Sequence, residues 1–142
     1  DHVDLGDESS ARAFLATRAA LPGMRERRHG RIINISSVVG HRGIAGTSAY
    51  AASKAALGGF TRAVAAEVAS RGITVNSLVL GYFDAGMGRQ LQDSVREQTL
   101  RSIPAGHFGD AGKLARIVAF LASDDCDYLT GQEIVVDGGF LG

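Results

Sequence analysis

"RIINISSVVG", residues 31–40, decides how the chain folds. Its first six residues are rich in β-branched isoleucine, and such a short, nearly continuous apolar run is typical of a buried strand. Two runs of the same kind follow, ITVNSLVL at 73–80 and EIVVD at 133–137. Strands that are apolar along their whole length are covered by helices on both faces, which is the arrangement of a parallel sheet.

Helical patterns lie before and between these strands. The first covers residues 10–28, with Pro22 as the position where the helix would kink or break. The second begins at Thr47 or Ser48, either of which is a suitable cap, and ends near Arg71, just before a glycine that supplies the stop.

Two further helices are predicted between the second and third strands. A polar helix covers residues 90–102, after a glycine-rich loop at 81–89, and another covers 110–123 with Asp110 as its cap. The alternation of strand and helix predicts an α/β fold with a doubly wound parallel sheet, in a single domain over residues 1–142.

The composition limits the classes of function. The 142 residues hold 15 basic and 15 acidic side chains, and this balance argues against a nucleic-acid or membrane-surface binder. Cys126 is the only cysteine, which excludes an internal disulfide and a cysteine-based metal cage. The four histidines lack metal-ligand spacing, so we expect no metal site. Without a signal peptide or a membrane-length apolar run, a cytoplasmic location is expected.

The residues that follow the strands are the first candidates for a site, because ligands of parallel α/β sheets bind beyond the carboxyl ends of the strands. Ser36 and Ser37 follow the first strand, and a loop starting at Gly81 follows the second. The third strand ends at Asp137 and two glycines.

The stretch SAYAASKAALGGF, residues 48–60, adds a second candidate. Tyr50 and Lys54 are four residues apart and therefore share one face of the predicted helix. A lysine ammonium group beside a phenol stabilises the phenolate, which suits a proton donor or acceptor. The same pair also occurs on ordinary helix faces, so its spacing alone leaves both interpretations open.

The order of motifs along the chain favours the catalytic interpretation of Tyr50 and Lys54 over an ordinary helix face. Ser37 lies thirteen positions before the Tyr-x-x-x-Lys pair, GITVNSLVLGYF follows it, and LTGQEIVVDGGF closes the chain. Together these elements resemble the short-chain dehydrogenase/reductase family, and within it the 3-oxoacyl-[acyl-carrier-protein] reductases, from about Ala11 to Gly142. The resemblance implies a Rossmann-like fold and an NAD(P)H-dependent oxidoreductase that reduces 3-oxoacyl thioesters on acyl carrier protein to 3-hydroxyacyl thioesters. NADP is the expected cofactor, and NAD is not excluded.

The resemblance also implies roles for single residues. Tyr50 is the general acid that protonates the carbonyl oxygen, Ser37 polarises the same oxygen, and Lys54 holds the nicotinamide ribose. The loop after the second strand resembles the family's P-G-x-x-x-T segment, whose backbone holds the nicotinamide carboxamide, and Gly81 and Phe83 keep those backbone positions. Ser36 is either structural or faces the cofactor, because neighbouring residues of a strand point to opposite sides.

Several family features are changed or missing. Leu80 stands where the family usually has proline, Ala85 where it has a threonine whose hydroxyl meets the cofactor, and Ser9 where it has an asparagine. The family's T-G-x-x-x-G-x-G turn and N-N-A-G strand end do not occur in the chain. We therefore expect the C-terminal part of a reductase, as a fragment of a longer enzyme or an incomplete gene product, whose strand at 31–36 lacks one neighbour.

The resemblance further suggests partners. Arg28 and Arg71 match positions at which the family's carrier-dependent reductases dock the acidic acyl carrier protein, although helix-end cations facing a dipole would look the same. A homodimer or homotetramer is expected. Two other readings of the function stay open: a reductase of a non-carrier alcohol, ketone or steroid, and a catalytically inactive truncated assembly module.

Overall fold

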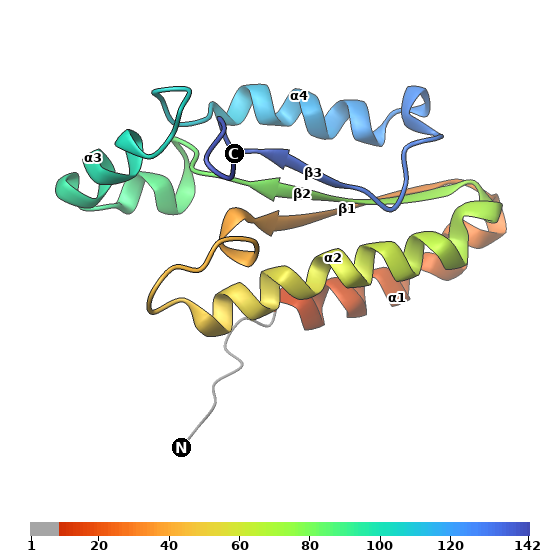
Figure 1. The fold of residues 1–142 in the computed structure, drawn as a ribbon. Coiled ribbons are helices and arrows are strands. Elements are labelled where there is room, and N and C mark those ends of the chain that lie inside the picture. Colours follow the sequence, from red (N-terminus) through yellow and green to blue (C-terminus); the bar gives the residue numbers. More distant parts are fainter. Residues whose placement is uncertain (1–8) are drawn as a thin grey trace, which may run out of the picture.

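The three predicted strands pair in parallel. The computed structural model describes residues 9–142, in which β1 (Gly30–Ser37), β2 (Ile73–Leu80) and β3 (Glu133–Val136) form one sheet in the order β1-β2-β3. Gly30 lies opposite Ile73, and Ser77 lies opposite Glu133. The carboxyl ends of all three strands therefore meet at one edge, as Figure 1 shows.

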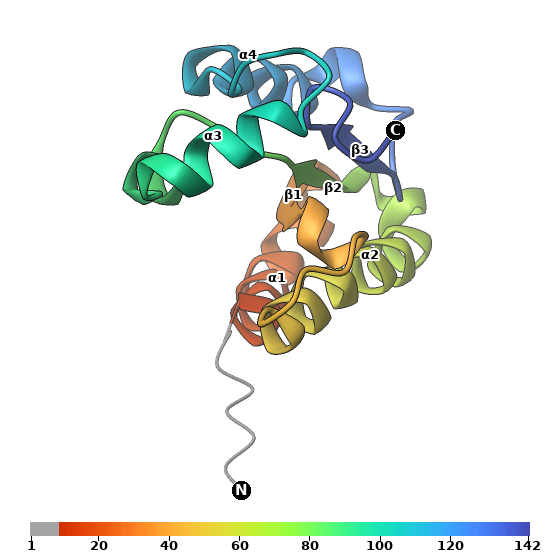
Figure 2. The ribbon, with the colours of Figure 1, turned by 60° about the vertical axis from the view of Figure 1, so that its left-hand side comes forward.

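Helices cover both faces of this sheet. The helices α1 (Ser9–Arg27) and α2 (Ser48–Val68) lie on one face, and α4 (Ala111–Ala122) lies on the other (Figures 1 and 2). The remaining helix, α3 (Asp93–Arg101), lies beyond the carboxyl ends of the strands. Four short 3₁₀ segments complete the structure: η1 (Val38–Gly40), η2 (Ala69–Arg71), η3 (Gly86–Gln90) and η4 (Asp124–Cys126). The predicted α/β class is confirmed.

The core lies on both sides of β2, the central strand, of which seven residues out of eight are buried. On one side, Val75 packs with Val68 of α2 and with Leu21 of α1. On the other side, Leu78 packs with Leu121 of α4. The strand is buried on both faces although its sequence includes the polar residues Thr74, Asn76 and Ser77.

Three details of the helices differ from the prediction. The helix α1 runs through Pro22 without a break, and its neighbours Leu21 and Met24 pack against the core, which holds the helix together at this point. Thr47 precedes α2, but its hydroxyl makes no cap hydrogen bond to the helix and donates to the carbonyl oxygen of Ile44. The helix α3 begins at Asp93 rather than at residue 90, since η3 occupies the residues before it.

Two predicted helix ends are confirmed. The Asp110 carboxylate accepts a 2.8 Å hydrogen bond from the backbone N–H of Lys113 and so caps α4. Gly72 has a φ of 69° after η2, a left-handed conformation that suits glycine and ends the helical segment before β2.

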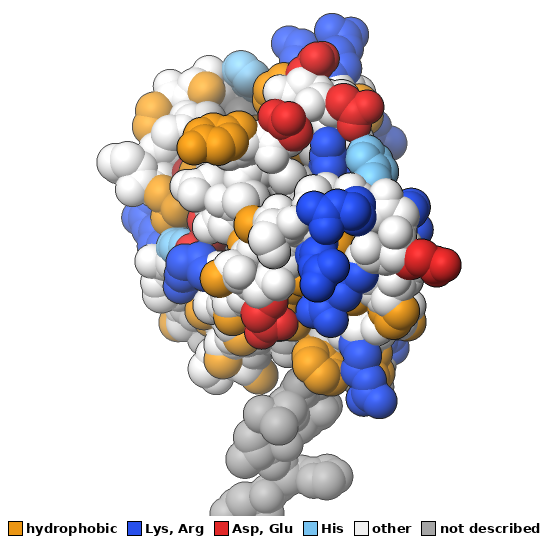
Figure 3. Space-filling model, turned by 90° about the vertical axis from the view of Figure 1, so that its right-hand side faces the viewer, with side chains coloured by type: hydrophobic (Ala, Val, Ile, Leu, Met, Phe, Trp, Pro, Cys, Tyr) orange, Lys and Arg blue, Asp and Glu red, His pale blue; other side chains and the backbone are white. Residues whose placement is uncertain are grey.

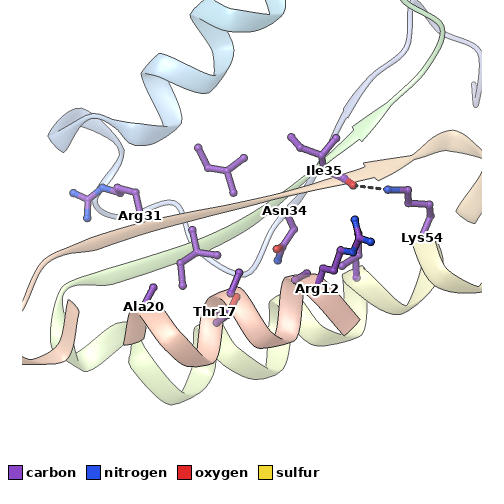
Figure 4. Close-up of a pocket in the computed structure, with 12 residues that line it drawn as sticks. Arg12, Thr17, Ala20, Arg31, Asn34, Ile35 and Lys54 are labelled. Carbon is purple, nitrogen blue, oxygen red and sulfur yellow. Dashed lines mark hydrogen bonds between the residues drawn. The ribbon is translucent and has the colours of Figure 1, made fainter. Parts of the chain in front are cut away.

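The outer edge of β1 is open within the described part of the chain, where β1 pairs only with β2. A groove of about 540 Å³ runs along this edge beside α1, and Ile35 is 45% exposed there (Figure 4). Within residues 9–142, the strand predicted at 31–36 thus has one neighbour, β2.

Candidate active site

A pocket of about 560 Å³ opens at the carboxyl ends of β1 and β2, beside the first turns of α2. It is the place where a parallel α/β sheet is expected to bind a ligand. Its lining includes all six residues proposed as catalytic or cofactor-binding: Ser36, Ser37, Tyr50, Lys54, Gly81 and Phe83. Residues from two strand ends and one helix thus meet in a single cavity.

Ser36 and Ser37 end β1 but have different surroundings. The Ser36 hydroxyl is buried, with 2% of the residue exposed, and donates a 2.9 Å hydrogen bond to the carbonyl oxygen of Lys54. Ser37 is the residue before η1, and its hydroxyl oxygen accepts a longer, 3.3 Å bond from the backbone N–H of Val39. Ser36 therefore ties the strand to α2, whereas the Ser37 hydroxyl keeps its own proton for donation to another acceptor.

Tyr50 and Lys54 lie one turn apart on α2. The Lys54 ammonium nitrogen is 5.6 Å from the centroid of the Tyr50 ring and donates a 3.1 Å hydrogen bond to the carbonyl oxygen of Ile35 (Figure 4). The chain segment after Ser37 rests directly on this helix, since a Cβ at Gly40 would lie 2.8 Å from the backbone nitrogen of Ala55. This close approach brings the end of β1 against the helix turn that carries the tyrosine and the lysine.

The loop after β2 forms the opposite wall. The N–H of Gly81 donates a 3.0 Å bond to the carbonyl oxygen of Val136, and a Cβ at Gly81 would lie 2.7 Å from the Cα of Asp137. Phe83 forms an isolated parallel bridge with Gly109. That bridge uses the Tyr82 carbonyl and the Asp84 N–H, so the backbone groups of Phe83 itself are not engaged by it.

Apolar residues other than the predicted site residues complete the pocket. They come from η1, from the loop after β2 and from the start of α4: Val39, Tyr82, Leu91, Ala111 and Leu114. The position of Tyr82 directly after a strand could have predicted that it lines the pocket. The two α4 residues reach the pocket only through the packing of that helix across the sheet, for which the sequence carries no local signal.

Arg28 and Arg71 lie at the other end of the sheet. Arg28 immediately precedes His29 and β1, and its guanidinium group donates to the carbonyl oxygen of Ser70, next to Arg71. Basic side chains gather on this face of the molecule (Figure 3). The eight residues of β1 span about 26 Å, which is the approximate distance between this face and the pocket. The structure therefore does not bring the two arginines to the pocket of the same chain.

Two other types of site are not found in residues 9–142. None of the helices there combines the length and the apolar character needed to cross a membrane. Over the same residues, histidine, cysteine, aspartate and glutamate side chains form no group of three or more that is arranged to hold a metal ion.

A parallel α/β sheet with a serine and a Tyr-x-x-x-Lys pair in one pocket at its carboxyl edge defines a protein of the short-chain dehydrogenase/reductase class. Comparison with known families agrees, because the family model described as enoyl-(acyl carrier protein) reductase matches residues 6–141. The chain therefore belongs to the short-chain dehydrogenase/reductase family.

Individual relatives narrow the comparison. The chain is 46% identical over 136 residues to 3-oxoacyl-[acyl-carrier-protein] reductase FabG of Vibrio cholerae, covering 96% of this chain and 56% of the relative. It is 52% identical over 126 residues to the same-named protein of Pseudomonas aeruginosa, covering 89% and 51%. The crystal structure of TT0495 protein from Thermus thermophilus matches with a TM-score of 0.85 and 40% identity, over 91% of this chain and 56% of that chain. The chain thus spans about half the length of the curated relatives that it matches.

Proposed function

We propose that this chain carries the catalytic part of an NADPH-dependent reductase that converts 3-oxoacyl thioesters on acyl carrier protein to 3-hydroxyacyl thioesters. The observation that carries the proposal is the meeting of Ser37, Tyr50 and Lys54 in one pocket at the carboxyl edge of the sheet. The names of the relatives support the choice of substrate. We expect the enzyme to be soluble and to carry out this reaction in the cytoplasm.

The chemistry of the three side chains fits carbonyl reduction. In the proposed reaction the Tyr50 hydroxyl gives its proton to the substrate carbonyl oxygen as negative charge develops there. The Ser37 hydroxyl donates a hydrogen bond to the same oxygen and stabilises this charge. The Lys54 ammonium group lies 5.6 Å from the Tyr50 ring centroid, so a cation stands beside the proposed proton donor.

The pocket residues fit the nicotinamide end of a dinucleotide. Reduced nicotinamide, when bound, supplies the hydride. Lys54 would hold the ribose hydroxyls, and the backbone of Phe83, which its bridge to Gly109 does not engage, would hold the carboxamide. Gly81 would contribute close backbone approach rather than its N–H, since that group already bonds Val136. The Ser36 hydroxyl already bonds Lys54, so Ser36 would act on the cofactor only by fixing that lysine.

The basic face around Arg28 and Arg71 is our candidate for docking the acidic carrier protein. Both side chains are exposed, and Arg28 is held in place by Ser70. Because about 26 Å separates this face from the pocket along β1, a docked carrier would serve the pocket of a second copy of the chain. Docking therefore requires an assembly.

Such an assembly would form through α1 and α2. Phe14 and Leu15 of α1 are 49% and 58% exposed, and Phe14 meets the ring of Phe60 of α2 at 6.3 Å. A groove of about 370 Å³ between the two helices adjoins these residues. We propose that a second copy covers this apolar face and that the protein is a homodimer or, with a further contact, a homotetramer.

The test of the reaction is the Tyr50→Phe variant of the purified protein, with Tyr128→Phe as control, since Tyr128 is 99% exposed. Turnover of a 3-oxoacyl thioester with NADPH should fall by about 10²–10⁴-fold in Tyr50→Phe. NADPH binding, followed by its fluorescence, should stay within about twofold of the unchanged protein, because the substitution removes only the hydroxyl. Unchanged turnover would refute the role of Tyr50. No fluorescence change with any variant would favour the inactive assembly module, and turnover of simple ketones alone would favour a non-carrier reductase.

A further inference from the structure

A row of aromatic rings and guanidinium groups runs beside the pocket. Its members, in spatial order, are Arg42, Phe140, Tyr82, Phe108 and Arg96. The Arg42 guanidinium carbon lies 4.6 Å from the Phe140 ring centroid, and the ring pairs Phe140–Tyr82 and Tyr82–Phe108 are 5.3 and 6.2 Å apart, edge to face. The row thus joins the segment after β1 to the loop after β2, and Tyr82 at its centre lines the pocket.

Arg96 ends this row and joins α3 to Phe108 and to the loop after β2. Its guanidinium carbon lies 4.4 Å from the Phe108 ring centroid. One terminal nitrogen donates a 3.1 Å bond to the carbonyl oxygen of Gly88, and the other donates a 3.2 Å bond to the Asp84 carboxylate. A planar guanidinium group can stack on a ring and donate sideways in this way, whereas a lysine ammonium group acts as a point charge.

The loop that Arg96 contacts is a wall of the pocket. Phe83, Ala85, Gly88 and Leu91 all line the cavity. The loop turns tightly, because a Cβ at Gly88 would run into the carbonyl oxygen of Phe83, and this turn presents the Gly88 carbonyl to Arg96. The helix α3 buries none of its nine residues, so packing into the core does not hold it. Its attachment to the wall therefore depends on directed polar contacts.

We propose that Arg96 is a positioning residue that holds the wall formed by residues 83–91 in the shape needed for ligand binding. The effect of Arg96 on ligand binding rests on the proposed function. Its effect on the shape of the wall does not. Removal of the guanidinium group leaves the Gly88 carbonyl without this donor, leaves Asp84 with only its 3.9 Å ion pair to Arg89, and leaves α3 without its contact to Phe108. The wall then opens locally, while the sheet and its core keep their packing.

Amide hydrogen exchange of the purified protein tests this inference without any substrate. Arg96→Met should raise the exchange rates of residues 84–92 by about tenfold or more and leave those of β2 unchanged. Arg96→Lys should recover at most part of the protection. Arg101→Met is the matched control on the same helix, because Arg101 pairs only at the surface with Glu97, at 3.5 Å, and its exchange pattern should equal that of the unchanged protein.

Three outcomes would overturn the inference: unchanged exchange over 84–92 in Arg96→Met, equally faster exchange in β2, or full protection in Arg96→Lys. Where the protein turns over a 3-oxoacyl thioester, Arg96→Met should also raise KM by a larger factor than it lowers kcat. Absence of turnover in every variant would count against the proposed function and not against the exchange result, so the two failures are distinguishable.

Discussion

The Lys54 ammonium group donates a 3.1 Å hydrogen bond to the carbonyl oxygen of Ile35, and this bond joins the helix that carries Tyr50 to the strand that ends in Ser37. A second bond runs the other way, from the Ser36 hydroxyl to the Lys54 carbonyl oxygen. Lys54 is therefore tied to β1 through both its side chain and its backbone. The relative position of the two proposed catalytic hydroxyls depends on this pair of bonds.

The two adjacent serines should respond differently to substitution. Ser36→Ala removes a buried hydrogen bond and leaves the Lys54 carbonyl without that donor, so the free energy of unfolding should fall by about 1–2 kcal/mol. Ser37→Ala loses only a 3.3 Å bond and should change stability little, but turnover should fall by about 10²-fold or more. Urea denaturation and steady-state kinetics of both variants check this. A stability loss confined to Ser37→Ala would contradict the assignment.

The close backbone contact at Gly81 should make the protein's stability sensitive to a methyl group at this position. In Gly81→Ala the new Cβ would lie 2.7 Å from the Cα of Asp137, a backbone atom that cannot swing away, and this should lower the free energy of unfolding by about 1–3 kcal/mol. Gly43→Ala is the control, because a Cβ there meets no heavy atom within 4 Å, and its effect should stay within about 0.5 kcal/mol. Thermal and urea denaturation measure both. Equal stability of the two variants would show that the β3 end does not hold the Gly81 loop.

The strands could be predicted from their runs of β-branched and apolar residues, although only β2 is buried along nearly its whole length. Five of the eight residues of the run 73–80 are apolar, and the run becomes β2 with the same bounds. The family's N-N-A-G strand end does not occur in the chain, and within residues 9–142 β1 pairs only with β2. Ser37, Tyr50 and Lys54 stand at the positions of the family's serine and Tyr-x-x-x-Lys motif, and the resemblance to that family is what predicts their common pocket.

Features that depend on several segments at once could not be predicted. The continuity of α1 through Pro22 depends on core contacts of its neighbours, which override the local preference of proline. The contacts of Arg96 need α3, the loop after β2 and Phe108 to come together, and no spacing rule links these segments. The same holds for the start of α2, where the Thr47 hydroxyl makes no cap bond to the helix and donates to Ile44 of the loop before it.

The apolar face of α1 and α2 leads to a prediction about assembly. Phe14→Asp places a charge on the proposed interface between copies, so it should shift the protein from dimer or tetramer towards monomer. Val95→Asp is the control, because Val95 is also exposed, at 44%, but lies on α3, away from this face. Size-exclusion chromatography with light scattering measures the mass of each. The proposed interface is wrong if the two variants and the unchanged protein share one mass.

The departure at Ala85 allows a gain-of-function test of the cofactor assignment. Ala85 lines the pocket, and its backbone is extended, with φ −154° and ψ 160°, a conformation that β-branched residues readily adopt. Threonine is the residue that the family has at this position, and its hydroxyl there meets the cofactor. Ala85→Thr should therefore add one hydrogen bond of about 1 kcal/mol and tighten NADPH binding by about fivefold.

Ala85→Val separates the hydroxyl from the added volume, because valine has the shape of threonine without the donor. Titration of NADPH fluorescence with the three proteins should rank Ala85→Thr above the unchanged protein and leave Ala85→Val equal to it or weaker. A matching gain in both variants would mean that apolar contact is responsible and that no acceptor on the cofactor faces this position. A loss in both would place the cofactor against Ala85 more tightly than the proposed nicotinamide site allows.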